Sequence, residues 1–501
     1  MIRALAHTFV AAAILLPQSA EAQYVAGDPA VIEALEVARI WLDAQHDYEE
    51  LPSMSVAIVH DQELVWSGAV GMADLDAQRP ATSTTLYSIC SISKLFTSVA
   101  LMQLRDQGKV DLSDAVSKHL PWYKVTQQYE DSSPVTIEGL LTHSAGLPRE
   151  SDHPYWSGPE YPFPTKQRVI AGLTNQETLY SSRTKYQYSN LGLSLAGYVV
   201  EEASGQPYHE YMRQHVLGPL GMSDTYSEMP RQHIDGQLAT GYSGITREGI
   251  RAEEPFFEAR GIAPAAGYAS TVDDLAKFAM WQFRLRGDRE EVLHGYTLAE
   301  MQRTHFVDPD NGTQRGLGFS VSRRDDKTWV GHGGSCPGFQ TSFTMQNDEK
   351  IAAIAFLNAR ESPSKYANGV YQLVVDALLA AAKGDPVSMA TDNGVEIEGD
   401  GSVPSPGAVD YEEYVGRYVR GMGDSETAVV DWRGGIAMLR LPTDNPRGSL
   451  TELEHVSGDT FRQVVDDEDS GAPEVKVIFD RDAQGKIIRV RNPTNYSTRV
   501  N

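Results

Sequence analysis

Strand-like stretches stand on both sides of a long helical region in this chain, and this order limits the folds open to it. Residues 53–75 read as two strands, because Met54, Val56 and Ile58 alternate with smaller residues. Four more strand patterns follow between 316 and 359, separated by polar turns. We therefore predict an α/β protein in which helices pack on an antiparallel sheet.

Apolar residues at helical spacing predict the helices around this sheet. The predicted spans are 29–48, the residues after Lys94 as far as Gly108, a helix that follows the turn holding Tyr188 and Asn190 and runs to Gly205, 270–285 and 365–382. In the second of these, Thr97 and Ser98 interrupt the apolar pattern. We expect that helix to be buried along a stripe and not all round.

The chain has 501 residues, more than one typical domain holds, and 41% of them are hydrophobic, enough for a substantial core. Residues 386–408 are rich in Gly, Pro, Ser and acids and read as a linker. This divides the chain into a main domain over 23–385 and a second over 409–501. The second is strand-like throughout, which predicts a small antiparallel barrel or sandwich.

The first 22 residues have the pattern of a secretory signal peptide. Arg3 precedes an apolar run, and Ala20 and Ala22 form a small-x-small ending before Gln23. The run is too short to span a bilayer, and no later segment has eighteen uninterrupted apolar residues. We expect an exported protein, periplasmic or secreted, without a membrane span.

The charge balance and the cysteine content limit the kinds of partner and cofactor that the protein can bind. The balance of 43 Lys+Arg against 68 Asp+Glu gives 43 − 68 = −25, which argues against nucleic acid or an anionic membrane. Two cysteines are too few for a disulfide scaffold, and no Cys/His cluster has zinc spacing. Neither a Walker loop nor a dinucleotide fingerprint occurs. We expect no metal and no cofactor, and a small-molecule or peptide substrate as the partner.

Ser91 and Lys94 are three residues apart, where a helix would place both on one face. A serine hydroxyl needs a neighbouring base to become a nucleophile, and a lysine whose pKa is lowered by burial can be that base. A capped helix start with a solvated lysine gives the same pattern. Ser182 with Lys185 and Ser362 with Lys365 also match this pattern. The spacing alone therefore does not show which of the three pairs is catalytic, and the surrounding sequence must decide.

Three motifs stand in order along the chain: Ser91-x-x-Lys94, Tyr188-x-Asn190, and His332-Gly333-Gly334 followed by Ser335. With them the sequence resembles the serine β-lactamase and penicillin-binding-protein superfamily, nearest to its class C-like group of D-aminopeptidases, D-Ala-D-Ala carboxypeptidases and family VIII esterases. The matching phrases are YSICSISKLFTS, TIEGLLTHSAGLP, KYQYSNLGLSLAGYVVE, LGPLGMSDT, AAGYASTVDDLAKF and GHGGSCPGF.

The resemblance implies a β-lactamase/transpeptidase-like sheet with a helical subdomain and assigns roles to the motif residues. Ser91 would be the acylated nucleophile, and Lys94 would assist its deprotonation. Tyr188 would shuttle a proton as general base in acylation and again in deacylation, its phenolate favoured by the Lys94 ammonium. Asn190 would bind the substrate amide. The backbone N–H groups of Ser91 and Ser335 would form the oxyanion hole.

His332 marks a departure from the β-lactamases proper, which resemble one another in having a lysine there to meet a substrate carboxylate. A histidine is mostly neutral above pH 7 and attracts an anion less. His332, Gly333 and Gly334 would line the substrate site of a peptidase or amidase that acts on small or linear peptides, including peptides with D-residues. The alternatives are a family VIII-like carboxylesterase, a β-lactamase, and a penicillin-binding protein that is acylated without turnover.

The oxyanion hole that the resemblance implies would bring Cys90 and Cys336 close together, since each adjoins one of its two N–H donors. We predict a disulfide between them, as in some class A carbapenemases; two buried free thiols are the alternative. The region from Tyr411 resembles the lipocalin-like domain of related hydrolases, which borders the active-site cleft, mediates oligomers or acts as a stabilising appendage.

Two further features lie near the motifs. His143 in LLTHSAG is read as structural. The aromatic residues Tyr155, Trp156, Tyr161 and Phe163 would either wall a pocket for an apolar substrate group or pack their own loop against the body.

Overall fold

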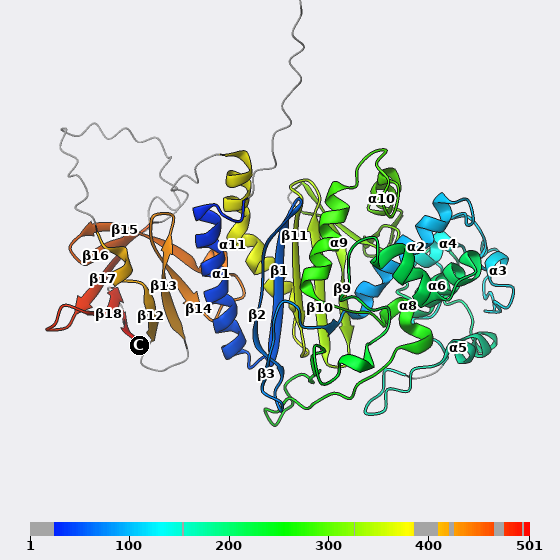
Figure 1. Cartoon of the computed structure of the whole chain (residues 1–501), viewed down its shortest axis with the longest axis horizontal. Helices are drawn as coiled ribbons and strands as arrows, with labels where there is room; N and C mark the ends of the chain where they lie inside the picture. The colour runs from blue at the N-terminus through cyan, green and yellow to red at the C-terminus, as the bar shows by residue number, and fades with distance from the viewer. Residues whose placement is uncertain are drawn as a thin grey trace, which may run out of the picture.

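The protein consists of a nine-stranded sheet between two groups of helices, with a closed barrel beside one group (Figure 1). This computed structural model describes residues 25–152, 155–324, 326–384, 409–419, 425–464, 475–492 and 495–500. The predicted signal peptide, 1–22, and the predicted linker, 386–408, lie outside the described residues. The predicted fold class is confirmed.

The strands of the sheet run antiparallel in the order β3-β2-β1-β11-β10-β9-β8-β7-β6. They are β1 (Ser53–His60), β2 (Glu63–Asp74), β3 (Arg79–Pro80), β6 (Phe306–Val307), β7 (Gln314–Arg315), β8 (Ser320–Arg324), β9 (Lys327–Cys336), β10 (Phe339–Gln346) and β11 (Ile351–Leu357). A further short pair is β4 (Tyr87–Ser88) with β5 (Ala269–Ser270).

β1 lies inside the sheet, between β2 and β11, and this pairing joins the two strand groups of the sequence. Ala57 is opposite Ile354 in the register of β1 and β11. Met54 and Val56 belong to the apolar cluster beneath α1 and α11, whereas Ala57 and Val59 belong to the cluster on the other face. β1 is therefore covered on both faces, because its side chains alternate between two layers of helices.

Helices α1 and α11 cover one face of the sheet, and the helices between β3 and β6 in the chain lie beyond the opposite face (Figure 1). The helices are α1 (Pro29–Tyr48), η1 (Cys90–Ile92), α2 (Ser93–Asp106), α3 (Val116–His119), α4 (Ile137–Thr142), α5 (Lys166–Gly172), η2 (Leu173–Asn175), α6 (Asn190–Ser204), α7 (Tyr208–Met212), η3 (Arg213–Leu217), η4 (Arg231–His233), η5 (Arg260–Ile262), α8 (Ala263–Ala266), α9 (Val272–Arg284), α10 (Gly295–Met301) and α11 (Pro363–Lys383).

The expectation of a single buried stripe on α2 is wrong. All ten residues from Ser93 to Met102 are buried. The hydroxyl groups that interrupt the apolar pattern are satisfied internally: Thr97 donates to Pro264 O at 2.6 Å and Ser98 donates to Lys94 O at 2.8 Å. A hydrogen-bonded hydroxyl can be buried at little cost, so these residues do not need to face water. α2 is the central helix of the domain.

Residues after 409 form a barrel, which decides between the barrel and the sandwich. Its elements are η6 (Tyr411–Glu413), β12 (Gly416–Val419), β13 (Glu426–Trp432), β14 (Gly435–Leu441), α12 (Pro446–Ser449), β15 (Leu450–Ser457), β16 (Thr460–Gln463), β17 (Lys476–Arg481), β18 (Ile487–Asn492) and β19 (Asn495–Arg499). The barrel docks on α1 and α11, where Trp41 Nε1 donates to Thr443 O at 2.9 Å and Arg433 N donates to Glu33 Oε2 at 2.5 Å. It therefore contacts helices on the sheet face opposite α2.

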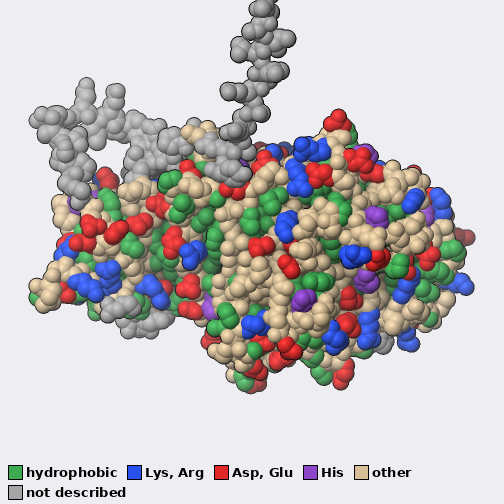
Figure 2. Space-filling model, in the orientation of Figure 1, with side chains coloured by type: hydrophobic (Ala, Val, Ile, Leu, Met, Phe, Trp, Pro, Cys, Tyr) green, Lys and Arg blue, Asp and Glu red, His purple; other side chains and the backbone are tan. Residues whose placement is uncertain are grey.

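Acidic and basic side chains are interspersed over the face seen in Figure 2, without one broad basic area. Within the described parts of the chain, no helix combines the length and apolar character that crossing a membrane requires.

Candidate active site

Ser91 lies in η1, a single 3-10 turn that leads into α2, and not on the α-helix itself. Cys90, the residue before it, has φ of 48°, in the left-handed region that a non-glycine residue seldom adopts. Ser93 supports the turn, because its hydroxyl donates to Cys90 O and accepts from Tyr268 N at 3.0 Å. The turn presents Ser91 half-buried at the start of α2.

Lys94 is fully buried with three polar neighbours around its amine. Nζ lies 3.1 Å from Ser91 Oγ, 2.8 Å from Asn190 Oδ1 and 2.7 Å from Ala265 O. The two oxygens of Asn190 and Ala265 can only accept hydrogen bonds here. A neutral amine has two N–H bonds, and these two acceptors use both. Its lone pair then faces the Ser91 hydroxyl, which is the geometry of a general base.

Burial lowers the pKa of Lys94 well below its usual range. The negative charge of Glu150 opposes this effect, while Arg149 and Arg315 add to it. The neutral amine that the geometry requires is thus the form that burial favours.

Tyr188 lies among basic and aromatic side chains. Its ring centroid is 4.8 Å from Lys94 Nζ, 4.8 Å from the Arg149 guanidinium carbon and 4.4 Å from the centroid of His143. Burial raises the pKa of Tyr188, and a hydrogen bond with Ser91 opposes the rise. The resting side chain is therefore a neutral phenol. The expectation that a Lys94 ammonium favours the Tyr188 phenolate is wrong for the resting site. Burial disfavours both the ammonium of Lys94 and the phenolate of Tyr188.

Asn190 is the first residue of α6, and its amide is bonded within the protein. Oδ1 accepts from Lys94, and Nδ2 donates to Glu150 Oε1 at 2.7 Å. Because both ends of the amide already have hydrogen-bond partners, fewer of its donors and acceptors are free for the substrate contact that the resemblance implies. Sequence reasoning missed Glu150 and Arg315, because neither belongs to a motif and nothing in their local pattern indicates the site.

β9 brings the third motif against η1. A Cβ on Gly334 would lie 2.4 Å from Ile89 O and 3.1 Å from Cys90 Cβ, so only glycine allows this approach. Residues at even steps along a strand share a face, which places the His332 side chain on the same side as Gly334. The His332 ring centroid is 6.2 Å from that of Tyr188.

The His332 ring is buried, with 8% of the residue exposed. Nδ1 lies 2.6 Å from Gly333 O, and because a carbonyl only accepts, Nδ1 carries the proton. Nε2 has no hydrogen-bond partner among the described residues. Burial, with Lys94 and Arg315 nearby, lowers the pKa of His332 to about 3. The ring is therefore neutral and presents an acceptor.

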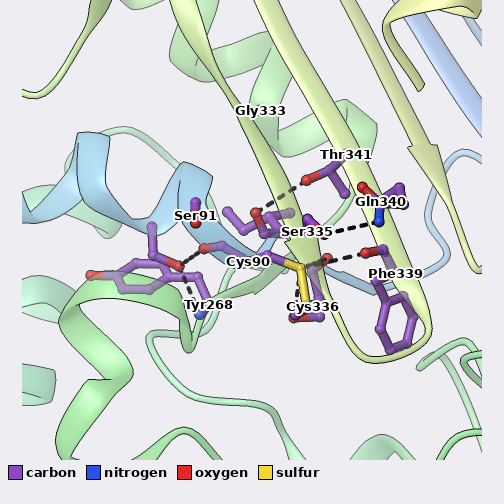
Figure 3. The surroundings of a disulfide bond; sticks show 12 residues. Cys90, Ser91, Tyr268, Gly333, Ser335, Cys336, Phe339, Gln340 and Thr341 are labelled. Carbon is purple, nitrogen blue, oxygen red and sulfur yellow. Dashed lines mark hydrogen bonds between the residues drawn. A yellow bond between two sulfur atoms is a disulfide. The ribbon is translucent and has the colours of Figure 1, made fainter. Parts of the chain in front are cut away.

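A disulfide joins Cys90 to Cys336, with their Cα atoms 5.8 Å apart. It ties η1 to the end of β9, and Figure 3 shows Ser91 and Ser335 next to its two cysteines. The Ser335 hydroxyl accepts from Gln340 Nε2 at 2.9 Å. The bond thus fixes the two backbone segments that would supply the oxyanion N–H groups.

We expect the double variant Cys90→Ala/Cys336→Ala to lose about 2–5 kcal/mol of unfolding free energy. The reason is that the bond closes a loop of 246 residues, which restricts the unfolded chain. Urea unfolding of the oxidised protein and of the variant measures the loss. Equal unfolding midpoints and slopes, or two free thiols by mass in protein purified without a reductant, would contradict the prediction.

The two remaining sequence features have structural roles here. His143 accepts from Ser189 N at 3.1 Å through Nδ1, which holds the start of α6. The aromatic loop residues pack with one another: the ring centroids of Tyr155 and Phe163 are 5.2 Å apart, and Phe163 stacks on Phe257 at 5.4 Å. The structure therefore shows that these rings pack their own loop against the body.

The other two Ser-x-x-Lys pairs lie away from this constellation. Lys185 is paired with Asp310 at 2.8 Å. Ser362 is the residue before α11, and Lys365 binds Glu49 at 2.6 Å. Neither lysine bonds its own serine in the structure. Among the described residues, no group of three or more His, Cys, Asp or Glu side chains could hold a metal ion.

Known proteins are similar to this chain in sequence and in fold. A family profile described as Beta-lactamase matches residues 41–379. The curated protein Unguisins hydrolase ungD' of Aspergillus campestris is 28% identical over 365 residues, which are 70% of this chain and 65% of that protein. The chain spans 62–65% of the length of the curated relatives it matches.

Two solved structures have the same fold. The octameric penicillin-binding protein homologue from Pyrococcus abyssi has a TM-score of 0.59 and 22% identity, over 93% of this chain and 99% of that one. D-amino acid amidase from Ochrobactrum anthropi SV3 has a TM-score of 0.56 and 25% identity, over 70% of this chain and 99% of that one.

Proposed function

The chain belongs to the beta-lactamase family, and from this premise we propose that it is a serine hydrolase that works through an acyl-enzyme on Ser91. The observation that carries the proposal is the amine of Lys94, buried 3.1 Å from Ser91 Oγ with both N–H bonds of its neutral form directed elsewhere. An unprotonated amine in that position can accept the serine proton.

Acylation would proceed with Lys94 as base. Its lone pair takes the Ser91 proton while Oγ attacks the substrate carbonyl carbon, and the N–H groups of Ser91 and Ser335 hold the resulting oxyanion. Collapse of this intermediate breaks the bond to the leaving group, which receives the proton of the neutral Tyr188 phenol. The adjacent Lys94 ammonium stabilises the phenolate that remains.

Deacylation would return both protons. The Tyr188 phenolate takes a proton from water, and the hydroxide attacks the acyl carbon. As the acyl bond to Oγ breaks, Lys94 gives its proton back to Ser91. The free enzyme is restored with a neutral amine and a neutral phenol, the states that burial favours for both groups.

We propose an amide substrate, a small or linear peptide that can contain D-residues. The neutral His332 ring, which presents an acceptor, suits a substrate N–H and gives little attraction to the carboxylate of a β-lactam. The named activity of the similar D-amino acid amidase supports amide cleavage, and the name of the similar unguisins hydrolase supports hydrolysis. Turnover of D- and L-amino-acid amides, p-nitrophenyl esters and nitrocefin tests this choice. Hydrolysis of nitrocefin alone, or of esters alone, would overturn it.

We expect His332→Lys to raise kcat/KM for nitrocefin relative to the best amide by roughly tenfold or more, because one charge-assisted hydrogen bond to a carboxylate is worth about 1.5–3 kcal/mol. His332→Gln is the matched control, since it replaces the ring without adding charge. An unchanged ratio in His332→Lys, or an equal rise in both variants, would show that charge at this position does not select the substrate.

We also propose that the protein is exported and that it can form oligomers. The small-x-small pattern before Gln23 supports export to the periplasm or medium. The similar Pyrococcus abyssi protein is octameric, which supports a test for oligomers by sedimentation.

A further inference from the structure

Glu150 lies at the outer end of a hydrogen-bond chain that reaches the catalytic amine. Its Oε1 accepts from Asn190 Nδ2 at 2.7 Å, and Asn190 Oδ1 accepts from Lys94 Nζ at 2.8 Å. An ionised carboxylate can only accept hydrogen bonds. Asn190 must therefore turn its NH₂ group to Glu150 and its oxygen to Lys94. The carboxylate fixes which way the amide faces.

The amide orientation decides where the lone pair of Lys94 points. With the Asn190 oxygen facing the amine, the two N–H bonds of neutral Lys94 go to that oxygen and to Ala265 O, and the lone pair is left for Ser91. With the amide turned by 180°, its N–H would face the amine and compete for the lone pair. The Ser91 proton would then lose its acceptor.

The surrounding loop holds Glu150 in place. Tyr155 donates its hydroxyl to Oε2, and Arg149 Nε lies 3.1 Å from Oε1. Tyr155 is 1% exposed and packs on Trp156 and Phe163. The aromatic cluster that fills the loop thus anchors the carboxylate through one phenol.

We propose that Glu150 is a positioning residue, which directs the lone pair of Lys94 to Ser91 by fixing the amide of Asn190. This inference rests on the proposed function, in which Lys94 is the base for Ser91. Glu150 touches neither Ser91 nor Lys94 through a hydrogen bond in the structure, so its effect passes through Asn190.

Glu150 also acts on the charge of Lys94. Its carboxylate raises the pKa of the amine against the stronger effect of burial. The other titratable or charged groups around Lys94 are Arg149, Arg315, Tyr188, His143 and His332. These groups remain in a variant at Glu150. A change in the pH dependence of kcat/KM in that variant is therefore caused by the loss of the Glu150 carboxylate.

The test is Glu150→Gln, which keeps the size of the side chain but can donate as well as accept, so that both amide orientations of Asn190 become possible. We expect kcat/KM to fall by about 10- to 100-fold, less than the loss from removing the base itself. We also expect the acidic limb of the kcat/KM profile to move to lower pH, since Lys94 loses a stabilising negative charge. Glu254→Gln is the matched control, because Glu254 also accepts from a tyrosine, Tyr161, at 2.6 Å but does not bond Asn190.

Two results would overturn the inference. One is wild-type kcat/KM and an unmoved acidic limb in Glu150→Gln. The other is a fall in kcat/KM with an unmoved limb and a loss of thermal stability, which marks a structural role alone. A separate experiment tests the proposed function itself, namely labelling of Ser91→Ala by a fluorophosphonate. If that variant is still labelled, Ser91 is not the nucleophile and the proposed function fails, whatever the result for Glu150.

Discussion

Replacing Ser91 by alanine is expected to abolish covalent labelling by a fluorophosphonate and to lower kcat/KM by about 10⁴-fold or more. The reason is that the proposed acyl-enzyme forms on Oγ, and among the described residues no other hydroxyl lies within hydrogen-bond distance of the Lys94 amine. Mass spectrometry of the labelled protein and turnover of the best amide substrate measure the two effects. The fold should be retained, because Ser91 is half-buried and the change removes one oxygen.

The chain supplies its own controls for this experiment. Ser182 and Ser362 also stand three residues before a lysine, so Ser182→Ala and Ser362→Ala remove the same atom from the same local pattern. Both variants should keep full labelling and turnover. Loss of labelling in either one, with labelling retained in Ser91→Ala, would move the nucleophile and refute the site.

Replacing Lys94 by methionine is expected to lower kcat by about 10²–10⁴-fold, the usual range for a general base. Methionine has a similar length but no lone pair on nitrogen to take the Ser91 proton. In the wild type, activity should rise with pH as Lys94 loses its proton, and this acidic limb should vanish from the residual activity of the variant. A persistent limb would assign it to another group.

The same variant should change how stability depends on pH. The pKa of Lys94 is lowered in the folded state, so between the folded and the unfolded pKa the unfolded chain binds more protons and wild-type stability rises with pH. Lys94→Met lacks this contribution. The unfolding free energy of the variant minus that of the wild type should therefore fall as pH rises.

Chemical denaturation between pH 6 and pH 10 measures this difference. Lys185→Met is the control, because Lys185 also follows a serine by three residues but is 45% exposed and pairs with Asp310. Its stability difference should not follow the trend of Lys94→Met. A constant difference for Lys94→Met would mean that Lys94 keeps its proton on folding and cannot be the base.

The sequence by itself determined the elements and the family. Residue periodicity placed α1 over 29–48, and the strand patterns of β1 and β2 occur where predicted, because both are local properties of the chain. The three motifs with their surrounding phrases identified the family, and the strand-like residues after 409 predicted the second domain. Each of these signals is contained in a short stretch of sequence, so it can be recognised without knowing the tertiary structure.

The tertiary structure alone decided which groups surround the Lys94 amine. Glu150 reaches Lys94 through Asn190, so residues 56 and 40 positions apart along the chain meet only after α6 packs on α2. The full burial of α2, the neutral state of His332 and the raised pKa of Tyr188 also depend on groups brought together from distant segments. The physical reason is that desolvation and hydrogen-bond direction are set by whatever packs against a side chain, and local sequence does not contain that information.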